Sequence, residues 1–129
     1  MVHAISEAFG EVQALSDEMQ EAFDGTPEPF RESSGASREA AASALAAACS
    51  YPFVPKMVGD IQVSWIEMHK GKDGKLFRSA RRDNIVRCLR SCLAKLPVHP
   101  DEDTSQLKQE LQTAITILGN VYFPGMSGR

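Results

Sequence analysis

The first thirty residues carry the clearest hydrophobic pattern of the chain. Apolar side chains recur every three or four residues from Ile5 to Phe23, and acidic side chains fill many positions between them. This spacing puts the apolar residues on one face of an α-helix, as expected for a helix that packs on a core. Gly25, followed by Pro27 and Pro29, predicts the end of the helix, with Gly25 as a left-handed cap. The apolar positions are Ile5, Ala8, Phe9, Val12, Leu15, Met19, Ala22 and Phe23.

A polar loop and a second helix are predicted next. Residues 31–37 are mostly polar and predict an internal loop. The alanine-rich stretch from Ser37 predicts a helix, because alanine has the highest helix propensity and serine is a favoured N-cap. Its small side chains favour close packing against a neighbouring helix. Pro52 and Pro55 break helical structure after it.

A β-hairpin is predicted in the middle of the chain. In residues 61–69, IQVSWIEMH, β-branched and aromatic side chains first alternate with polar ones, as in a half-buried strand. Asp73-Gly74 is a strong turn signal, and residues 76–79 offer a short return strand. A two-stranded hairpin is marginal alone, so we expect it to lie on the helices or to join a partner's sheet.

The stretch LFRSARRDNIVRCLRSCLAKL, residues 76–96, predicts a third helix. Its arginines precede an amphipathic pattern that stops at Pro97, and the helix is expected to begin near Ser79. The stripe that faces the core comprises Ile85, Leu89, Cys92, Leu93 and Leu96.

The last predicted helix follows a short acidic run. Asp103 is the candidate N-cap, with Gln106 in the position that a capping box requires. Gly119 or Gly125 is expected to end the helix, and residues 124–129 to form a flexible tail. The apolar stripe of this last helix comprises Leu107, Leu111, Ala114, Ile115, Leu118 and Tyr122.

Together these patterns predict a single domain, 1–129, of the mainly α (α+β) class, with about four helices and one short antiparallel β-hairpin. The composition, 43% hydrophobic and 24% charged, is typical of a globular chain. No apolar run is long enough to span a membrane, and the N-terminus lacks the features of a secretion signal. Three cysteines, an odd number, favour reduced thiols, so we expect a cytoplasmic protein.

The net charge of -3 is unevenly distributed along the chain. Residues 1–30 contain seven acidic residues and no Lys or Arg. Residues 56–98 contain ten basic residues and four acidic ones. The two regions can neutralise each other within the fold, or each can face a partner of opposite charge.

The basic segment is the best candidate for a site. On a helical wheel Arg78, Arg81 and Arg82 fall on the same side as the core stripe that begins at Ile85. They also lie at the positive end of the helix dipole, where each cation is disfavoured by roughly 0.3 to 1 kcal/mol. This placement requires an acidic counterpart. The sequence therefore predicts a basic ridge for phosphates or an acidic protein surface, comprising Lys70, Lys72, Lys75, Arg78, Arg81 and Arg82.

Two other interpretations of the arginines stay open. The helix could start later, with Asp83 as its N-cap, and leave the arginines in a solvated loop. Alternatively, the arginines could pair inside the fold with acidic residues of the first helix. The candidates for this pairing are Glu7, Glu11, Asp17 and Glu18.

Metal and catalytic chemistry have little support in the sequence. Cys88 and Cys92 lie one helical turn apart, but His3, His69 and His99 show no spacing of metal ligands. Buried thiols that act as small hydrophobic groups are the expected state of the cysteines. The chain also lacks a Ser-His-Asp order and a glycine-rich phosphate loop. We therefore expect no enzyme activity, no metal and no cofactor.

The first helix and its exit, FGEVQALSDEMQEAFDGTPEPF, resemble a family signature. An acidic helix that ends in a D-x-x-P-E motif is found in small accessory proteins of phages, plasmids and related mobile elements. The order of the following segments is also similar, up to the ARRDN segment that opens a helix, so the resemblance covers residues 7–96. The chain departs from the signature at Ala22 and Gly25, where Trp and Asn are usual. The resemblance implies an accessory protein of a mobile element.

The expected function is non-catalytic binding. The leading hypothesis is docking of the basic ridge, Lys70 to Arg82, onto an acidic protein surface or nucleoprotein of the host or the element, for example to inhibit host defence. The alternative is direct binding of nucleic acid by the same segment, 70–82. A homo-oligomer stays open as well, because the hairpin edge and the alanine-rich helix both offer surfaces for self-association.

Overall fold

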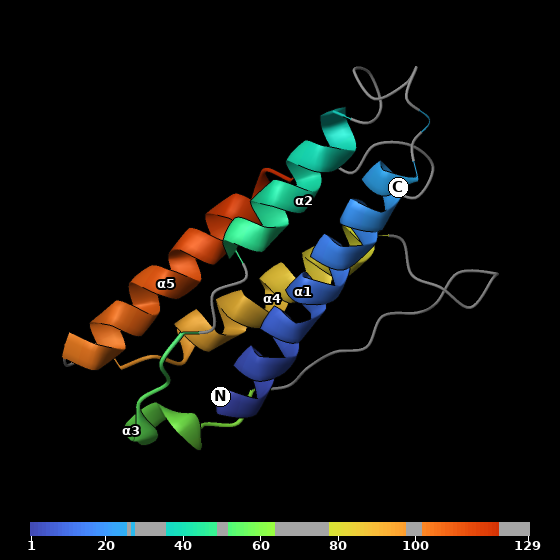
Figure 1. Cartoon of the computed structure of the whole chain (residues 1–129). Coiled ribbons are helices and arrows are strands. Elements are labelled where there is room, and N and C mark those ends of the chain that lie inside the picture. Colours follow the sequence, from blue (N-terminus) through green and yellow to red (C-terminus); the bar gives the residue numbers. More distant parts are fainter. Residues whose placement is uncertain (26, 28–35, 49–51, 64–77, 98–101, 122–129) are drawn as a thin grey trace.

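A computed structural model describes residues 1–25, 27, 36–48, 52–63, 78–97 and 102–121 (Figure 1). In these residues the fold consists of four long helices and one short one, without a β-strand. The helices are α1 (Val2–Asp24), α2 (Ala36–Ala48), α3 (Lys56–Gly59), α4 (Arg78–Ala94) and α5 (Glu102–Gly119). The predicted mainly helical class is therefore confirmed.

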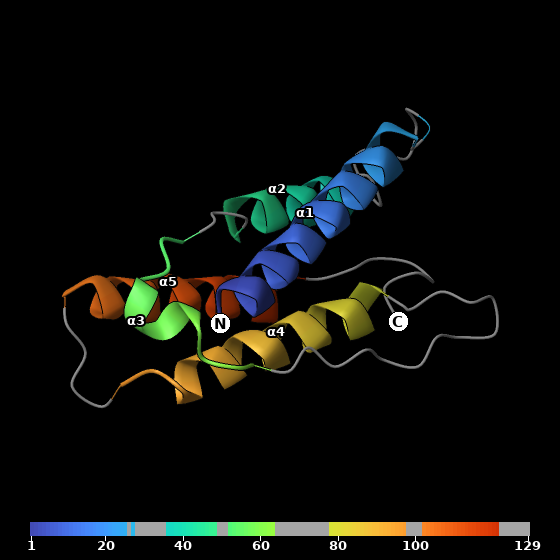
Figure 2. The same ribbon diagram turned by 90° about the horizontal axis from the view of Figure 1, so that it is seen from below.

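The long helices form a four-helix bundle. Helix α1 packs against α2 and α4, and α5 packs against the same two helices. Figure 2 shows α1 and α2 on one side of the bundle and α4 and α5 on the other. Arg81 near the start of α4 contacts Glu18 late in α1, whereas Cys88 contacts Ala4, so these two helices are antiparallel. This arrangement places the first turn of α4 between the middle of α1 and the end of α5.

The apolar stripes predicted from the sequence form the core. Helix α1 contributes its stripe from Ile5 to Met19, whose six positions are all buried, whereas Ala22 and Phe23 are only half-buried. Side chains such as these contribute roughly 1.5 to 3 kcal/mol each when fully buried. The other long helices contribute mainly Ala41, Ala42, Leu45, Ala48, Ile85, Cys88, Leu89, Cys92, Leu107, Leu111, Ala114 and Leu118.

Helix α2 lies close to α1 because its contact face is built from alanine. Ala41 and Ala42 are buried against the core, and the Ser16 hydroxyl donates a buried hydrogen bond of 3.2 Å to the Ala42 carbonyl. From α2, Arg38 donates a hydrogen bond of 3.3 Å to the Ala22 carbonyl near the end of α1. A cation is favoured at this end of a helix dipole. The close packing expected of the alanine-rich helix is therefore present.

Several predicted helix ends differ from the structure. Gly25 ends α1 as predicted, but with φ -82° and ψ -3° it is right-handed, so the left-handed cap was wrong. Its N–H still reaches the Glu21 carbonyl, at 2.9 Å. Helix α2 begins at Ala36, inside the predicted loop 31–37. Helix α5 begins at Glu102, which puts Asp103 in its first turn, so Asp103 is not the N-cap.

The predicted β-hairpin is not supported. Residues 61–63 are described and are not a strand, while residues 64–77, including Asp73-Gly74, lie outside the described part of the chain. Carbonyls of a strand would accept hydrogen bonds from a neighbouring strand. Here the Gln62 carbonyl accepts from Lys95 Nζ, and the Ile61 carbonyl from the amino group of Met1. The predicted tail, 124–129, also lies outside the described residues.

Candidate functional site

The first turn of α4 is held to α1 by a cluster of ion pairs, which we call the arginine clamp: Arg78, Arg81, Glu11 and Glu18. Arg81 Nε lies 2.5 Å from Glu11 Oε1, and Arg81 Nη1 lies 2.7 Å from Glu18 Oε2. Arg78 Nε adds a longer contact of 3.3 Å to Glu18 Oε1. The clamp joins residues 60 to 70 positions apart in the sequence.

Arg81 is the centre of the clamp. Its side chain is 17% exposed, and those of Glu11 and Glu18 are 32% and 34% exposed. Burial of the guanidinium lowers the pKa of Arg81, but the hydrogen bonds to Glu11 and Glu18, together with their charges, raise this pKa above its usual value overall. Arg81 therefore keeps its charge at every pH at which the protein is handled.

Arg82 has a different partner at the other side of α4. Its Nη1 donates to the carbonyls of Leu118, at 3.2 Å, and Val121, at 2.9 Å. These carbonyls belong to the last turn of α5 and the residues after it, where a cation is favoured by the helix dipole. Arg82 Nε also lies 2.6 Å from Asp83 Oδ1. The positive charge of Arg82 is disfavoured at the N-terminal end of α4, but the C-terminal end of α5 beside it offsets this effect.

The structure therefore brings together half of the predicted basic ridge. Arg78, Arg81 and Arg82 meet at one end of α4, and all three contact groups of the chain itself. Helix α4 begins at Arg78, close to the predicted start, so the interpretation with Asp83 as N-cap was wrong. Lys70, Lys72 and Lys75 lie outside the described residues.

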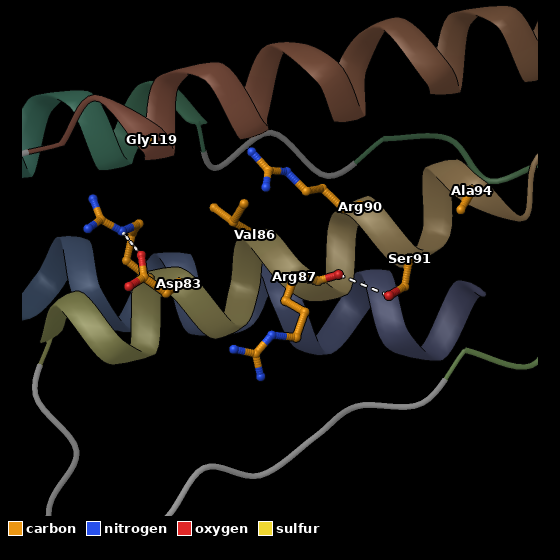
Figure 3. Close-up of a pocket in the computed structure, with 8 residues that line it drawn as sticks. Asp83, Val86, Arg87, Arg90, Ser91, Ala94 and Gly119 are labelled. Atoms are coloured by element: carbon orange, nitrogen blue, oxygen red, sulfur yellow. Dashed lines mark hydrogen bonds and ion pairs between the residues drawn. The ribbon is translucent and has the colours of Figure 1, made fainter.

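An open groove of about 570 Å³ runs along α4 beside the end of α5 (Figure 3). Val86 and Ala94 give it an apolar strip, and Gly119 contributes no side chain, which keeps the α5 end open. A Cβ atom built on Gly119 meets nothing within 4 Å. The lining residues are Arg82, Asp83, Val86, Arg87, Arg90, Ser91, Ala94 and Gly119.

Arg87 and Arg90 supply the accessible charge of this groove. Both are exposed, and within the described part of the chain neither side chain has an ion-pair partner. In Figure 3, Arg90 extends from α4 toward α5, whereas Arg87 leaves α4 on the opposite side. Guanidinium groups at this spacing can each bind a carboxylate or a phosphate in a bidentate manner.

Arg87 and Arg90 were not among the residues that the sequence predicted for the site. The signal that could have found them is their spacing with Val86 and Ala94, which forms a second, mixed face beside the core stripe of α4. That face becomes a groove only because α5 ends next to it, and the position of α5 cannot be read from local sequence.

The two described cysteines are buried in α4. Cys88 Sγ lies 3.8 Å from the Ala4 carbonyl, and a hydrogen bond with Cys92, together with burial, raises the pKa of the Cys88 thiol. Within the described residues no group of three or more His, Cys, Asp or Glu side chains is placed to hold a metal ion. The thiols therefore pack as part of the core.

Comparison of this chain with known proteins identifies no relative. No protein family, no curated protein and no solved structure matches this chain. Among the described helices, none is both long enough and apolar enough to cross a membrane.

Proposed function

We propose that this chain is a non-catalytic accessory protein of a mobile element, and that it binds an acidic protein surface through the groove on α4. Arg90 and Arg87, on the two sides of α4, bind carboxylates of the partner, and Val86 and Ala94 contact its apolar side chains. The bound target is a host or element protein in the cytoplasm, such as a component of host defence.

One observation supports this proposal most strongly: the arginines of α4 divide into two groups. Arg78 and Arg81 are neutralised by Glu11 and Glu18, whereas Arg87 and Arg90 face solvent beside an open groove. Solvent-exposed cations next to an apolar strip match the composition of protein interfaces, in which arginine is enriched. We therefore place the proposed docking surface at Arg87 and Arg90, in the middle of α4, and not at the predicted basic ridge from Lys70 to Arg82.

An acidic protein fits the groove better than a nucleic acid does. Binding of duplex DNA requires a row of cations that follows the phosphates, and the acidic face of α1 would repel a long polyanion. Among the described residues that line the groove, none is an aromatic side chain on which unpaired bases could stack. Nucleic-acid binding through the basic segment 70–82 remains the alternative hypothesis.

The mobile-element context is supported by the sequence resemblance of residues 7–96. The cytoplasmic location is supported by the odd number of cysteines and by the packing of Cys88 and Cys92 as free, buried thiols. Both parts of the proposal can be examined in a bacterial host. Expression of the wild-type chain should raise the plating efficiency of a phage that host defence restricts, and R87E/R90E should not raise it.

A binding assay tests the groove directly. The probe is a fluorescein-labelled peptide of alternating glutamate and leucine, and anisotropy is measured at low salt. We expect a dissociation constant of about 10 to 100 μM, weakened at least about tenfold in R87E/R90E. K56E/K108E is the matched control, because it makes the same change in net charge at exposed lysines outside the groove. Equal affinities of the two variants would contradict the proposal.

A second arm of the assay tests the alternative hypothesis, which is nucleic-acid binding. A labelled 20-base-pair duplex and a single strand of the same length replace the peptide. If the duplex or the strand binds more tightly than the peptide, with a steep loss of affinity in added salt, nucleic acid is the ligand. Charge reversal at Lys70, Lys72 and Lys75 should then weaken that binding. The proposal predicts little binding to either nucleic acid at physiological salt.

A further inference from the structure

The second half of α1 carries a row of exposed carboxylates, which we call the acidic stripe: Asp17, Glu21 and Asp24. They follow one another at spacings of four and three residues, so they lie on one face of the helix. Gln13 Nε2 donates to Asp17 Oδ1 at 3.0 Å, and Gln20 Nε2 donates to Asp24 Oδ1 at 3.1 Å. In the described part of the chain no Lys, Arg or His forms an ion pair with any of the three carboxylates. The bundle therefore leaves the charge of the stripe unneutralised.

The groove on α4 has the opposite charge and a similar length. Arg87 and Arg90 are exposed beside it and, within the described residues, lack an ion-pair partner. At about 1.5 Å per residue, the groove strip from Val86 to Ala94 is about 12 Å long, and the stripe from Asp17 to Asp24 is about 10 Å long. The two arginines leave α4 on opposite sides (Figure 3), so a helix that lies along α4 can meet both.

The stripe and the groove of one molecule cannot meet. Helix α1 packs on α2 and α4, and α5 packs on the same two helices, so α1 and α5 are diagonally opposite in the bundle. The groove lies beside the end of α5, whereas the stripe faces solvent on α1. The side of α1 that faces α4 carries the contacts of Glu11 and Glu18 with Arg81. A contact between the stripe and the groove therefore requires two molecules.

We propose that the acidic stripe of one copy of this chain docks in the groove of a second copy. Arg87 and Arg90 of the second copy donate charge-assisted hydrogen bonds to carboxylates of the stripe. Because the two surfaces differ, every complex keeps a free stripe and a free groove, and association continues head to tail beyond a dimer. The inference rests on the proposed function, which makes the groove a docking surface. It adds a form of regulation, since self-association and binding of an acidic partner exclude each other.

The contact between copies is weak and reversible. It consists mainly of exposed ion pairs, which contribute little individually and are screened by salt. Among the described residues of the groove, only Val86 and Ala94 offer apolar side chains. We expect a dissociation constant of roughly 0.1 to 1 mM at low salt. In about 0.5 M salt the dissociation constant should rise at least about fivefold.

Sedimentation equilibrium of the full chain at low salt tests the contact. D17N/D24N removes two charges of the stripe but keeps the oxygens that accept from the glutamines, and it should weaken association at least about fivefold. E39Q/E102Q is the matched control, because it removes the same charges from exposed positions outside the stripe and the groove. This control should associate as the wild type does.

A mixture of two variants tests the pairing of the surfaces. R87Q/R90Q should also weaken association at least about fivefold when it is measured alone. D17N/D24N keeps the groove that R87Q/R90Q has lost, and R87Q/R90Q keeps the stripe. Their mixture should therefore form one-to-one complexes with the affinity of the wild type that grow no further. Both variants keep a negative net charge, because the wild type carries -3 and each variant loses two charges of one sign. Attraction between oppositely charged molecules cannot explain such complexes.

Three results would overturn the inference. They are a monomeric wild type at about 1 mM and low salt, unchanged association of D17N/D24N, and a monomeric mixture under conditions in which the wild type associates. The anisotropy assay with the glutamate–leucine peptide keeps the proposed function separate, because it uses the protein at about 10 μM, where self-association is negligible. Peptide binding that depends on Arg87 and Arg90, without self-association, overturns this inference alone. The loss of both shows that the groove is not a docking surface.

Discussion

Breaking the arginine clamp should destabilise the bundle by more than an ordinary surface ion pair would. Two unit charges about 4 Å apart attract by about 4 kcal/mol at an effective dielectric constant of 20. The clamp is one-sixth to one-third exposed, so solvent screening and desolvation reduce the net value of each pair to about 1 to 2 kcal/mol. Arg81 forms two such pairs, with Glu11 and Glu18, and its loss also leaves the two carboxylates close together.

The expected result is a loss of about 2 to 3 kcal/mol in the free energy of unfolding for Arg81→Met, and about 1 to 1.5 kcal/mol for Glu18→Gln. Methionine keeps the aliphatic volume of the arginine stem, so that mainly charge is removed. For a chain of this size, a loss of 2 to 3 kcal/mol corresponds to a fall in Tm of roughly 6 to 15 °C. Arg90→Met, on the exposed face of the same helix, should change stability by less than about 0.5 kcal/mol.

Urea denaturation of Arg81→Met, Glu18→Gln and the variant with both changes completes a double-mutant cycle. The account predicts a coupling energy of about 1 to 2 kcal/mol between Arg81 and Glu18. Added salt should reduce this coupling only in part, because partly buried pairs are weakly screened. If the two single effects simply add, the contact between Arg81 and Glu18 does not stabilise the fold, contrary to this expectation.

Three smaller predictions follow from other contacts. Arg82→Met should cost about 1 to 2 kcal/mol and speed hydrogen exchange at the end of α5, because it removes the donor to the Leu118 and Val121 carbonyls; unchanged exchange there would contradict this role. Gly119→Ala should raise stability by up to about 0.7 kcal/mol in thermal unfolding, since the added Cβ meets no atom and alanine favours the helix. In a Cys49→Ser background, alkylation of Cys88 and Cys92 by iodoacetamide should be limited by global unfolding, because both thiols are buried and the pKa of Cys88 is raised; rapid alkylation of the native protein would show that α4 is not packed as described.

The helices were predictable because their signals are local. The stripe from Ile5 to Met19 repeats over several turns and is fully buried in the structure. The strand predicted to begin at residue 61 is absent from the described residues 61–63, because the Ile61 and Gln62 carbonyls are satisfied by the amino group of Met1 and by Lys95 despite the strand-like composition. Contacts with such distant partners override local propensity and leave no trace in the spacing of nearby residues.

The candidate site was predictable only in part for the same reason. The position of the arginines on the helical wheel correctly indicated that Arg78 and Arg81 need anions. It could not decide between a ligand and Glu11 or Glu18, which are 60 to 70 residues away in the sequence. The groove at Arg87 and Arg90 depends on where α5 ends, which is a property of the assembled bundle.

The arginines of α4 divide into a structural group, Arg78 and Arg81, and an accessible group, Arg87 and Arg90. Thermal unfolding of two variants, R78Q/R81Q and R87Q/R90Q, tests this claim most directly, because both remove two arginine charges from the same helix. The account predicts that R78Q/R81Q lowers Tm by at least roughly 6 °C, whereas R87Q/R90Q changes it by no more than about 2 °C. Equal melting temperatures for the two variants would contradict the division.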